Sequence, residues 1–258
     1  MVASQTHADW WKSAFNDGAY PLNDLAKTPG WRDMTRRQVD FISRVLAKGR
    51  GRDVLDVCCG TARHAIGLAR KGWRVCGADI SPAYLRQAAL DARAAKVAFE
   101  LVRTDARAMP FSGRFDAAIN IFSSFGYFKT VSDDLKMLKS IYRALKPGGL
   151  FLLDTVNGKA TRRQWAKQRW TKVGKELFVL EEGRLLPGDI ARTHWVFIKK
   201  GHVQEMTSFI RMYDLPRLQR LLVWAGFKCV RAYGELDGRS YRSAASPRLA
   251  VLAVKPYG

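Results

Sequence analysis

Short apolar runs alternate with helix-like segments in this sequence from residue 53 onward. The patterns predict strands over Asp53 to Cys58, Arg74 to Ala78, Ala98 to Arg103, Phe115 to Phe122 and Gly149 to Asp154, and helices over Arg63 to Lys71, Pro82 to Lys96 and Val131 to Leu145. This alternation is typical of a parallel sheet covered by helices. We therefore predict an α/β fold with a doubly wound sheet.

The alternation stops after Thr155. Three segments, ELFVLEEGRLL, DIARTHWVFIKK and HVQEMTSFIRMY, carry strand patterns joined by turn residues, which predicts an antiparallel sheet. The first pattern then resumes with a helix over Asp214 to Phe227, the strand KCVRAYGEL and a closing strand over Arg248 to Lys255. We predict three parts: a helical cap at 1–50, a main domain at 51–158 and 214–258, and an inserted antiparallel sheet or lid at 159–213.

The formal charge is +21, from 44 Lys and Arg against 23 Asp and Glu, and it creates a positive field that attracts anions. Nucleic acid, phosphorylated metabolites and acidic membrane surfaces all fit, as does a surface that is merely rich in arginine. Residues 159–175 hold seven Lys or Arg, two tryptophans and no acids. At helical spacing, one face of this stretch would join Arg162, Trp165, Arg169 and Lys172. Such a face could bind a phosphate or a carboxylate. The alternative is a solvated face whose tryptophans pack on the sheet.

The sequence carries no run of about 18 uncharged apolar residues, and the N-terminal MVASQTHADWWK lacks the basic-then-apolar order of a secretory signal. We therefore expect a cytoplasmic protein with no membrane partner. The cysteines, at 58, 59, 76 and 229, form no disulfide framework, and adjacent Cys58 and Cys59 on a strand would point to opposite faces. The histidines show no ligand spacing, so we predict free thiols and no metal.

Acidic residues stand where several predicted strands end. Asp56 lies at the end of the first strand, Asp79 closes the second, and Asp105 follows the third. Ligands of open parallel sheets bind beyond these carboxyl ends. Asp79 follows Gly60 by 19 residues, a spacing that suits hydrogen bonds to ribose hydroxyls in dehydrogenases and methyltransferases alike, and it also fits an ordinary helix N-cap.

The turn after the first strand separates the two enzyme classes. A dinucleotide site needs Gly-x-Gly-x-x-Gly so that the backbone can approach a pyrophosphate, and here Ala62 stands at the middle position. A pyrophosphate ligand is therefore disfavoured. Asp105 suits a hydrogen bond to an adenine amino group, and a sulfonium ligand has no phosphate that these acids would repel.

Six blocks in order, VLDVCCGTARH, RVCGADIS, RTDARAMPF, FDAAINIFSSFGYF, LKPGGLFLLD and RLAVLAVK, resemble the class I S-adenosylmethionine-dependent methyltransferases. The resemblance runs from about residue 50 to 155 and from 214 to the end. The segment FSSFGYFKT is similar to that of sugar amino-group dimethyltransferases and other small-molecule methyltransferases, as is the antiparallel insertion. The resemblance implies a Rossmann-like sheet with a C-terminal antiparallel strand, S-adenosyl-L-methionine as cofactor and a small-molecule substrate, which the positive charge allows to be anionic.

The resemblance also implies roles for single residues. The loop from Asp56 to Ala62 would carry the methionine part of the cofactor, Asp79 the ribose, Asp105 the adenine, and Phe122 would border the transfer site. Ala62 departs from the family, which most often has glycine there. The expected cofactor contacts are Asp56, Cys58, Gly60, Thr61, Ala62, Asp79, Ile80, Asp105, Ala106, Phe122 and Ser123, with Arg36 as a candidate partner for the methionine carboxylate.

Methyl transfer from a sulfonium needs little beyond alignment of the acceptor with the methyl carbon. A general base would matter for a protonated amine or a hydroxyl, and the candidates are Tyr20, His64 and Tyr127. Each also fits a structural role, as a partner of a helix or as aromatic packing.

Three functions remain to be compared. A small-molecule methyltransferase is favoured by FSSFGYF and by an insertion able to roof a pocket. An RNA methyltransferase is the alternative because of the charge, although the Asn/Asp-Pro-Pro-Tyr/Phe pattern of many such enzymes is absent and NIFSS stands in its place. A non-catalytic cofactor-binding regulator is the third possibility, and intact acids at 56, 79 and 105 speak against it.

Overall fold

The computed structural model describes residues 9–16, 25 and 28–257. Its main element is a seven-stranded sheet in the order β10-β11-β5-β4-β1-β2-β3. The strands are β1 (Asp53–Val57), β2 (Arg74–Asp79), β3 (Glu100–Arg103), β4 (Phe115–Asn120), β5 (Leu145–Val156), β10 (Lys228–Tyr233) and β11 (Arg248–Val254). The first five pair in parallel, and β11 runs antiparallel to both neighbours. The predicted doubly wound sheet with an antiparallel C-terminal strand is confirmed.

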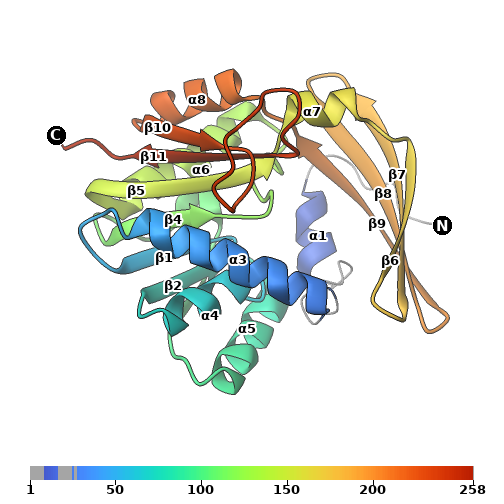
Figure 1. The fold of residues 1–258 in the computed structure, drawn as a ribbon, viewed down its shortest axis with the longest axis horizontal. Coiled ribbons are helices and arrows are strands. Elements are labelled where there is room, and N and C mark those ends of the chain that lie inside the picture. The colour runs from blue at the N-terminus through green and yellow to red at the C-terminus, as the bar shows by residue number, and fades with distance from the viewer. Residues whose placement is uncertain (1–8, 17–24, 26–27, 258) are drawn as a thin grey trace.

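Helices cover both faces of this sheet (Figure 1). One face carries α3 (Pro29–Leu46), α4 (Arg63–Arg70) and α5 (Pro82–Ala94), and the other carries α6 (Val131–Ala144) and α8 (Leu215–Trp224). Successive residues of β1 point to opposite faces, so that Val54 joins one apolar cluster and Leu55 the other. The sheet is therefore buried on both sides, as parallel sheets usually are.

The sequence between β5 and α8 forms a second sheet that stands beside the main one (Figure 1). It begins with the short helix α7 (Gly158–Arg163) and continues as β6 (Gln168–Val173), β7 (Leu177–Leu186), β8 (Ile190–Lys199) and β9 (His202–Arg211), all antiparallel. We call β6 to β9 the lid sheet. The helix α1 (Trp10–Asn16) lies between the lid sheet and the main sheet.

Several element bounds differ from the sequence-based expectation, and two of the differences bear on the site. The basic stretch 159–175 is helical only over α7, which ends at Arg163. Of the four residues predicted to share a helical face, only Arg162 is on that helix; Trp165 follows it, and Arg169 and Lys172 lie on β6. The predicted strand ending at Phe122 stops at Asn120, because Phe122 and Ser123 have φ angles of 73° and 67°, outside the strand region.

No helix within the described residues has the length and the apolar character needed to cross a bilayer. Among the same residues, the side chains of His, Cys, Asp and Glu nowhere form a group of three arranged for a metal ion. Cys58, Cys59, Cys76 and Cys229 are all free thiols.

Candidate active site

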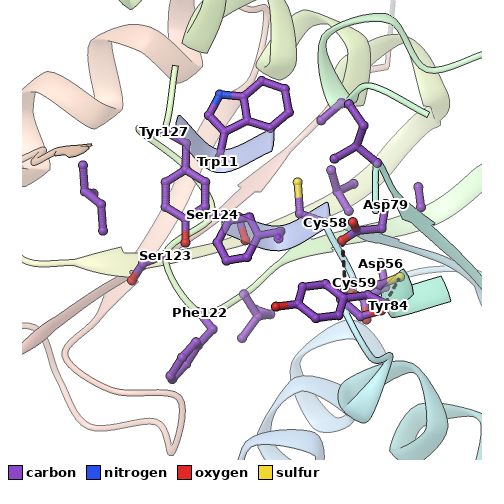
Figure 2. Close-up of a pocket in the computed structure, with 18 of the residues that line it drawn as sticks. Trp11, Asp56, Cys58, Cys59, Asp79, Tyr84, Phe122, Ser123, Ser124 and Tyr127 are labelled. Carbon is purple, nitrogen blue, oxygen red and sulfur yellow. Dashed lines mark hydrogen bonds between the residues drawn. The ribbon is translucent and has the colours of Figure 1, made fainter. Parts of the chain in front are cut away.

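A cavity of about 440 Å³ lies at the carboxyl ends of β1, β2 and β4 (Figure 2). Strand ends and the turns after them form one wall, and α1 contributes a second wall with Trp10, Trp11 and Phe15. The lid sheet supplies a third wall, made of Trp195, Met206, Ser208 and Ile210. A ligand in this cavity would therefore lie between the main sheet, α1 and the lid sheet.

The turn after β1 is wound through three left-handed residues. Cys58, Gly60 and Ala62 have φ angles of 58°, 56° and 59°. Cys58, Gly60 and Thr61 line the cavity, whereas the Ala62 side chain is fully buried in the apolar cluster beneath α3 and α4 and does not line it. The methyl group that replaces the family's usual glycine thus points into the core.

Asp79 ties this turn to the end of β2. The Asp79 side chain is labelled in Figure 2. Its Oδ2 accepts a hydrogen bond from the Gly60 N–H at 2.8 Å, and its Oδ1 accepts one from the Ser81 N–H at 2.8 Å. Burial raises the pKa of the Asp79 carboxyl, and the backbone hydrogen bonds partly offset this. Because a carboxylate has about four lone-pair sites, the Asp79 carboxylate can still accept from a ligand hydroxyl.

Asp56 is buried next to the same turn. Its Oδ2 has no hydrogen-bond partner among the described residues. Burial raises the pKa of Asp56 to about 7, against the opposing charge of Arg63. A buried acid with an unsatisfied oxygen at a cavity wall is a feature typical of binding sites.

Asp105 lines the cavity beyond β3 but is already engaged. Its carboxylate accepts hydrogen bonds from the Arg107 backbone N–H at 2.9 Å and from the Arg107 Nη2 at 2.6 Å. Burial opposes ionisation of Asp105, yet these bonds outweigh it and lower the pKa. The Arg107 guanidinium stacks 4.7 Å from the centre of the Phe128 ring and 5.9 Å from that of Trp11. The pair therefore also links the cavity to α1.

Phe122 and Ser123 are held at the cavity edge by Asp154. The Phe122 N–H donates to the Asp154 carboxylate at 3.0 Å, and the Ser123 N–H donates to the Asp154 carbonyl at 3.1 Å. Arg248 pairs with the same buried carboxylate through its Nε at 3.1 Å. The Ser123 Oγ is buried without a hydrogen-bond partner in the described part of the chain. We call residues 121–130 the acceptor loop.

Two of the three general-base candidates lie in different surroundings, and the third lies outside the described residues. His64 lines the cavity but is 5% exposed, and its Nε2 lies 2.9 Å from the Gln38 Oε1. Burial holds the pKa of His64 well below its usual value, so the ring is neutral. Tyr127 lies inside the cavity, with its ring centre 4.8 Å from that of Trp10 and 5.7 Å from that of Phe15. Tyr20 lies outside the described residues.

Most of the expected cofactor contacts come together around the cavity. Only two of those described lie elsewhere: Ala62 faces the core, and Arg36 is 74% exposed and pairs with Asp33 on its own helix at 2.5 Å. The contacts that line the cavity are Asp56, Cys58, Gly60, Thr61, Asp79, Ile80, Asp105, Ala106, Phe122 and Ser123.

Sequence reasoning predicted a helical cap and an insertion able to roof a pocket, but not which of their residues form the opposite walls. The double tryptophan of α1 was visible as an unusual pair, but nothing local placed it against Arg107 and Phe128. The residues Met206, Ser208 and Ile210 alternate along β9, which marks one face of a strand. That alternation does not say what the face covers.

Comparisons with known proteins agree on one family. A family profile described as "Methyltransferase domain" matches residues 54–149. The glycine/sarcosine N-methyltransferase of Parasynechococcus marenigrum is 30% identical over 215 residues, which cover 80% of this chain and 73% of that protein. The putative methyltransferase YqeM of Bacillus subtilis is 36% identical over 107 residues, 42% of each chain.

Solved structures show the same fold. A S-adenosylmethionine-dependent methyltransferase from Clostridium acetobutylicum superposes with a TM-score of 0.78 at 18% identity, over 86% of this chain and 92% of that one. CalS10, an amino pentose methyltransferase from Micromonospora echinaspora, superposes with a TM-score of 0.65 at 18% identity, over 98% of this chain and 99% of that one. The protein is thus an enzyme of the class I fold. It belongs to the S-adenosylmethionine-dependent methyltransferases, as the six sequence blocks predicted.

Proposed function

We propose that the protein transfers a methyl group from S-adenosyl-L-methionine to a small molecule bound between the acceptor loop and the lid sheet. The observation that carries this proposal is the single cavity that joins the acids at the ends of β1, β2 and β3 to an apolar wall of the lid sheet. The lining residues fit the cofactor, since Asp56 offers an unsatisfied buried oxygen and Asp79 offers free lone pairs.

In this proposal the cofactor lies along the strand ends. Asp79, with Ile80 beside it, binds the ribose hydroxyls, and Asp105 and Ala106 border the adenine. Cys58, Gly60 and Thr61 enclose the methionine part. When bound, the cofactor supplies an electrophilic methyl group on a positively charged sulfur. Arg36 and Ala62 take no direct part, because neither side chain lines the cavity.

The task of the protein's own residues is then to hold the acceptor in line with that methyl group and to exclude water. Phe122 and Ser123 line the cavity at the start of the acceptor loop, just after β4. Of the two described base candidates, Tyr127 lies on the acceptor loop whereas His64 lies on α4 beside the turn after β1, so Tyr127 is the better placed to contact an acceptor.

The lid-sheet side of the cavity favours a small molecule with apolar surface, since Trp195, Met206 and Ile210 line it. The lining acids Asp56, Asp79 and Asp105 lie at the ends of β1, β2 and β3. Two lining arginines are each already paired with an acid, Arg169 with Glu181 and Arg248 with Asp154. Relatives named as glycine/sarcosine N-methyltransferases and ubiquinone biosynthesis O-methyltransferases act on small molecules, which supports the same class here. A cytoplasmic location remains a prediction.

Two measurements test the proposal. Calorimetry with S-adenosylmethionine should show binding that Asp79→Asn weakens at least about tenfold, the equivalent of 1.4 kcal/mol. Asp40→Asn is the control, since Asp40 pairs with Lys71 and does not line the cavity. Equal binding by all three proteins would remove Asp79 from the site.

The acceptor class needs a transfer assay. Methyl-labelled cofactor is incubated with the protein and either a metabolite library that includes amino acids, amino sugars and phenols, or total RNA. Label in a small molecule is the expected result. Label in RNA alone, with salt-sensitive RNA binding, would replace the small-molecule proposal by the RNA alternative.

A further inference from the structure

The acceptor loop has two faces. Ser124, Tyr127 and Phe128 line the cavity, whereas Phe125, Gly126 and Lys129 contact the end of β9 and the residues just after it. The same strand β9 carries Met206, Ser208 and Ile210 on the cavity wall. One end of one strand thus holds the back of the loop whose front faces the ligand.

The backbones of the loop and strand are in direct contact. The Arg211 N–H donates to the Gly126 carbonyl at 2.8 Å. Gly126 has a φ of 95°, and a Cβ at this position would lie 2.4 Å from the Arg211 carbonyl oxygen. Only glycine permits this approach.

A buried charge cluster reinforces the contact. The Arg211 Nη2 donates to the Lys129 carbonyl at 2.6 Å, and its Nε lies 3.4 Å from the Asp134 Oδ2. The Tyr213 hydroxyl donates to the same Asp134 oxygen at 2.6 Å. Asp134, Tyr213 and Arg211 are 0%, 1% and 6% exposed. Because Asp134 lies in the first turn of α6, directly after the acceptor loop, the cluster joins three elements around that loop.

We propose that Asp134 is a positioning residue that fixes the acceptor loop against the lid sheet through Arg211 and Tyr213. This role rests on the proposed function in one respect: the proposed function places the acceptor between this loop and the lid sheet. Removal of the carboxylate leaves a buried guanidinium without its counter-charge, and such a group forces local rearrangement. The rearrangement reaches Tyr127 and Phe128 because they lie on the same short loop.

The protonation behaviour of the cluster supports the proposal. Burial raises the pKa of Asp134 to about 7, against the opposing effects of Tyr213 and Arg211. The neighbouring Asp133 raises it further, and Arg217 of α8 faces the Tyr213 ring at 5.6 Å. Below neutral pH the carboxyl gains a proton and loses its attraction for Arg211, so the loop is held less firmly.

Hydrogen exchange on the full chain tests this. In Asp134→Asn, amides of residues 123–129 should exchange at least about tenfold faster, while those of β1 and β4 keep their rates. The exchange of this loop, corrected for its intrinsic pH dependence, should slow between pH 6 and 8 in the native protein and lose that response in the variant.

The controls separate a local role from general destabilisation. Asp40→Asn removes an exposed carboxyl on α3 that pairs with Lys71, and should leave the loop unchanged. Tyr213→Phe deletes one hydroxyl and carries the test if the Asp134 variant does not fold; it should loosen the same loop to a smaller extent. Uniform acceleration across the chain, or an unchanged loop in both variants, would overturn the proposal. Loss of cofactor binding by the native protein would instead refute the proposed function, whatever the loop does.

Discussion

At the level of single residues, the turn after β1 shows what local sequence can and cannot fix. The end of a strand followed by Gly60 predicts a tight turn, and the structure has one. The direction of the Ala62 methyl group was not predictable, because it depends on the left-handed backbone at Ala62 and on the packing of α3 over α4. At position 62, where the family most often has glycine, this protein therefore needs a left-handed backbone and has room for a methyl group.

Replacement of Ala62 by glycine tests this reading of the turn. Glycine relieves the strain of the left-handed backbone, which stabilises the folded state. It also removes a buried methyl group and raises the conformational entropy of the unfolded chain, which both destabilise the folded state. Because these effects oppose each other, the free energy of unfolding should change by less than about 1 kcal/mol. Affinity for S-adenosylhomocysteine should change less than about twofold. Calorimetry and urea unfolding measure both quantities, and a tenfold gain in affinity would show that the methyl group crowds the ligand after all.

Asp56 makes the stability of the protein depend on pH. Its folded pKa of about 7 lies above its unfolded value, so folding favours the protonated form and this carboxyl costs stability as pH rises toward 7. Asp56→Asn removes that cost. The variant should gain stability over the native protein more at pH 8 than at pH 5, measured by urea unfolding at both values. A difference that is the same at the two pH values would contradict the assignment.

At the level of elements, α1 is more than a cover for apolar surface. The Ser81 hydroxyl donates to the Phe15 carbonyl at 3.0 Å, and Trp11 stacks on the Arg107 that holds Asp105. The helix is thus fastened to the side of the cavity where β2 and β3 end. Its closure over the cavity depends on aromatic side chains.

Trp11→Ala should weaken binding of S-adenosylhomocysteine about tenfold, mainly through faster dissociation, because one aromatic wall and one contact to Arg107 are lost. Stopped-flow fluorescence with calorimetry measures the rate and the affinity. Trp170→Ala is the matched control, since Trp170 is 61% exposed on β6. Equal dissociation from both variants would remove α1 from cofactor retention.

The elements also show why one strand was missed. β7, β8 and β9 carry recognisable strand patterns, whereas five of the six residues of β6 are exposed and the sixth is half-buried. An edge strand with both faces near solvent has no apolar alternation to detect. Its basic residues therefore looked like a helical face.

At the level of the whole molecule, the sequence predicted the half of the site that comes from consecutive strand ends. Parallel strands bring their carboxyl ends to one edge, so Asp56 and Asp79 had to be neighbours. The other half joins residues far apart in the chain, such as Gly126 and Arg211, and depends on how the lid sheet docks. No short-range pattern encodes that docking.

Strand order makes a whole-molecule prediction. β11 has partners on both sides, whereas β10 is an edge strand with an irregularity between Cys229 and Arg231. Val251→Pro removes a hydrogen bond and clashes in the sheet interior, so it should cost about 3 kcal/mol or more, while Val230→Pro at the irregularity should be tolerated. Urea unfolding and soluble yield compare the two; similar losses would contradict the expected difference.

The position of β11 in the sheet also affects the order in which the protein folds during synthesis. Residues 248–254 leave the ribosome after every other strand of the described residues, yet they fit between β5 and β10. Until they arrive, β5 presents an open edge of hydrogen-bonding groups to any other chain nearby. A newly made chain can therefore pair with other chains through the open edge of β5 until β11 is in place. A permuted gene that encodes β11 beside β5 would shorten this aggregation-prone period.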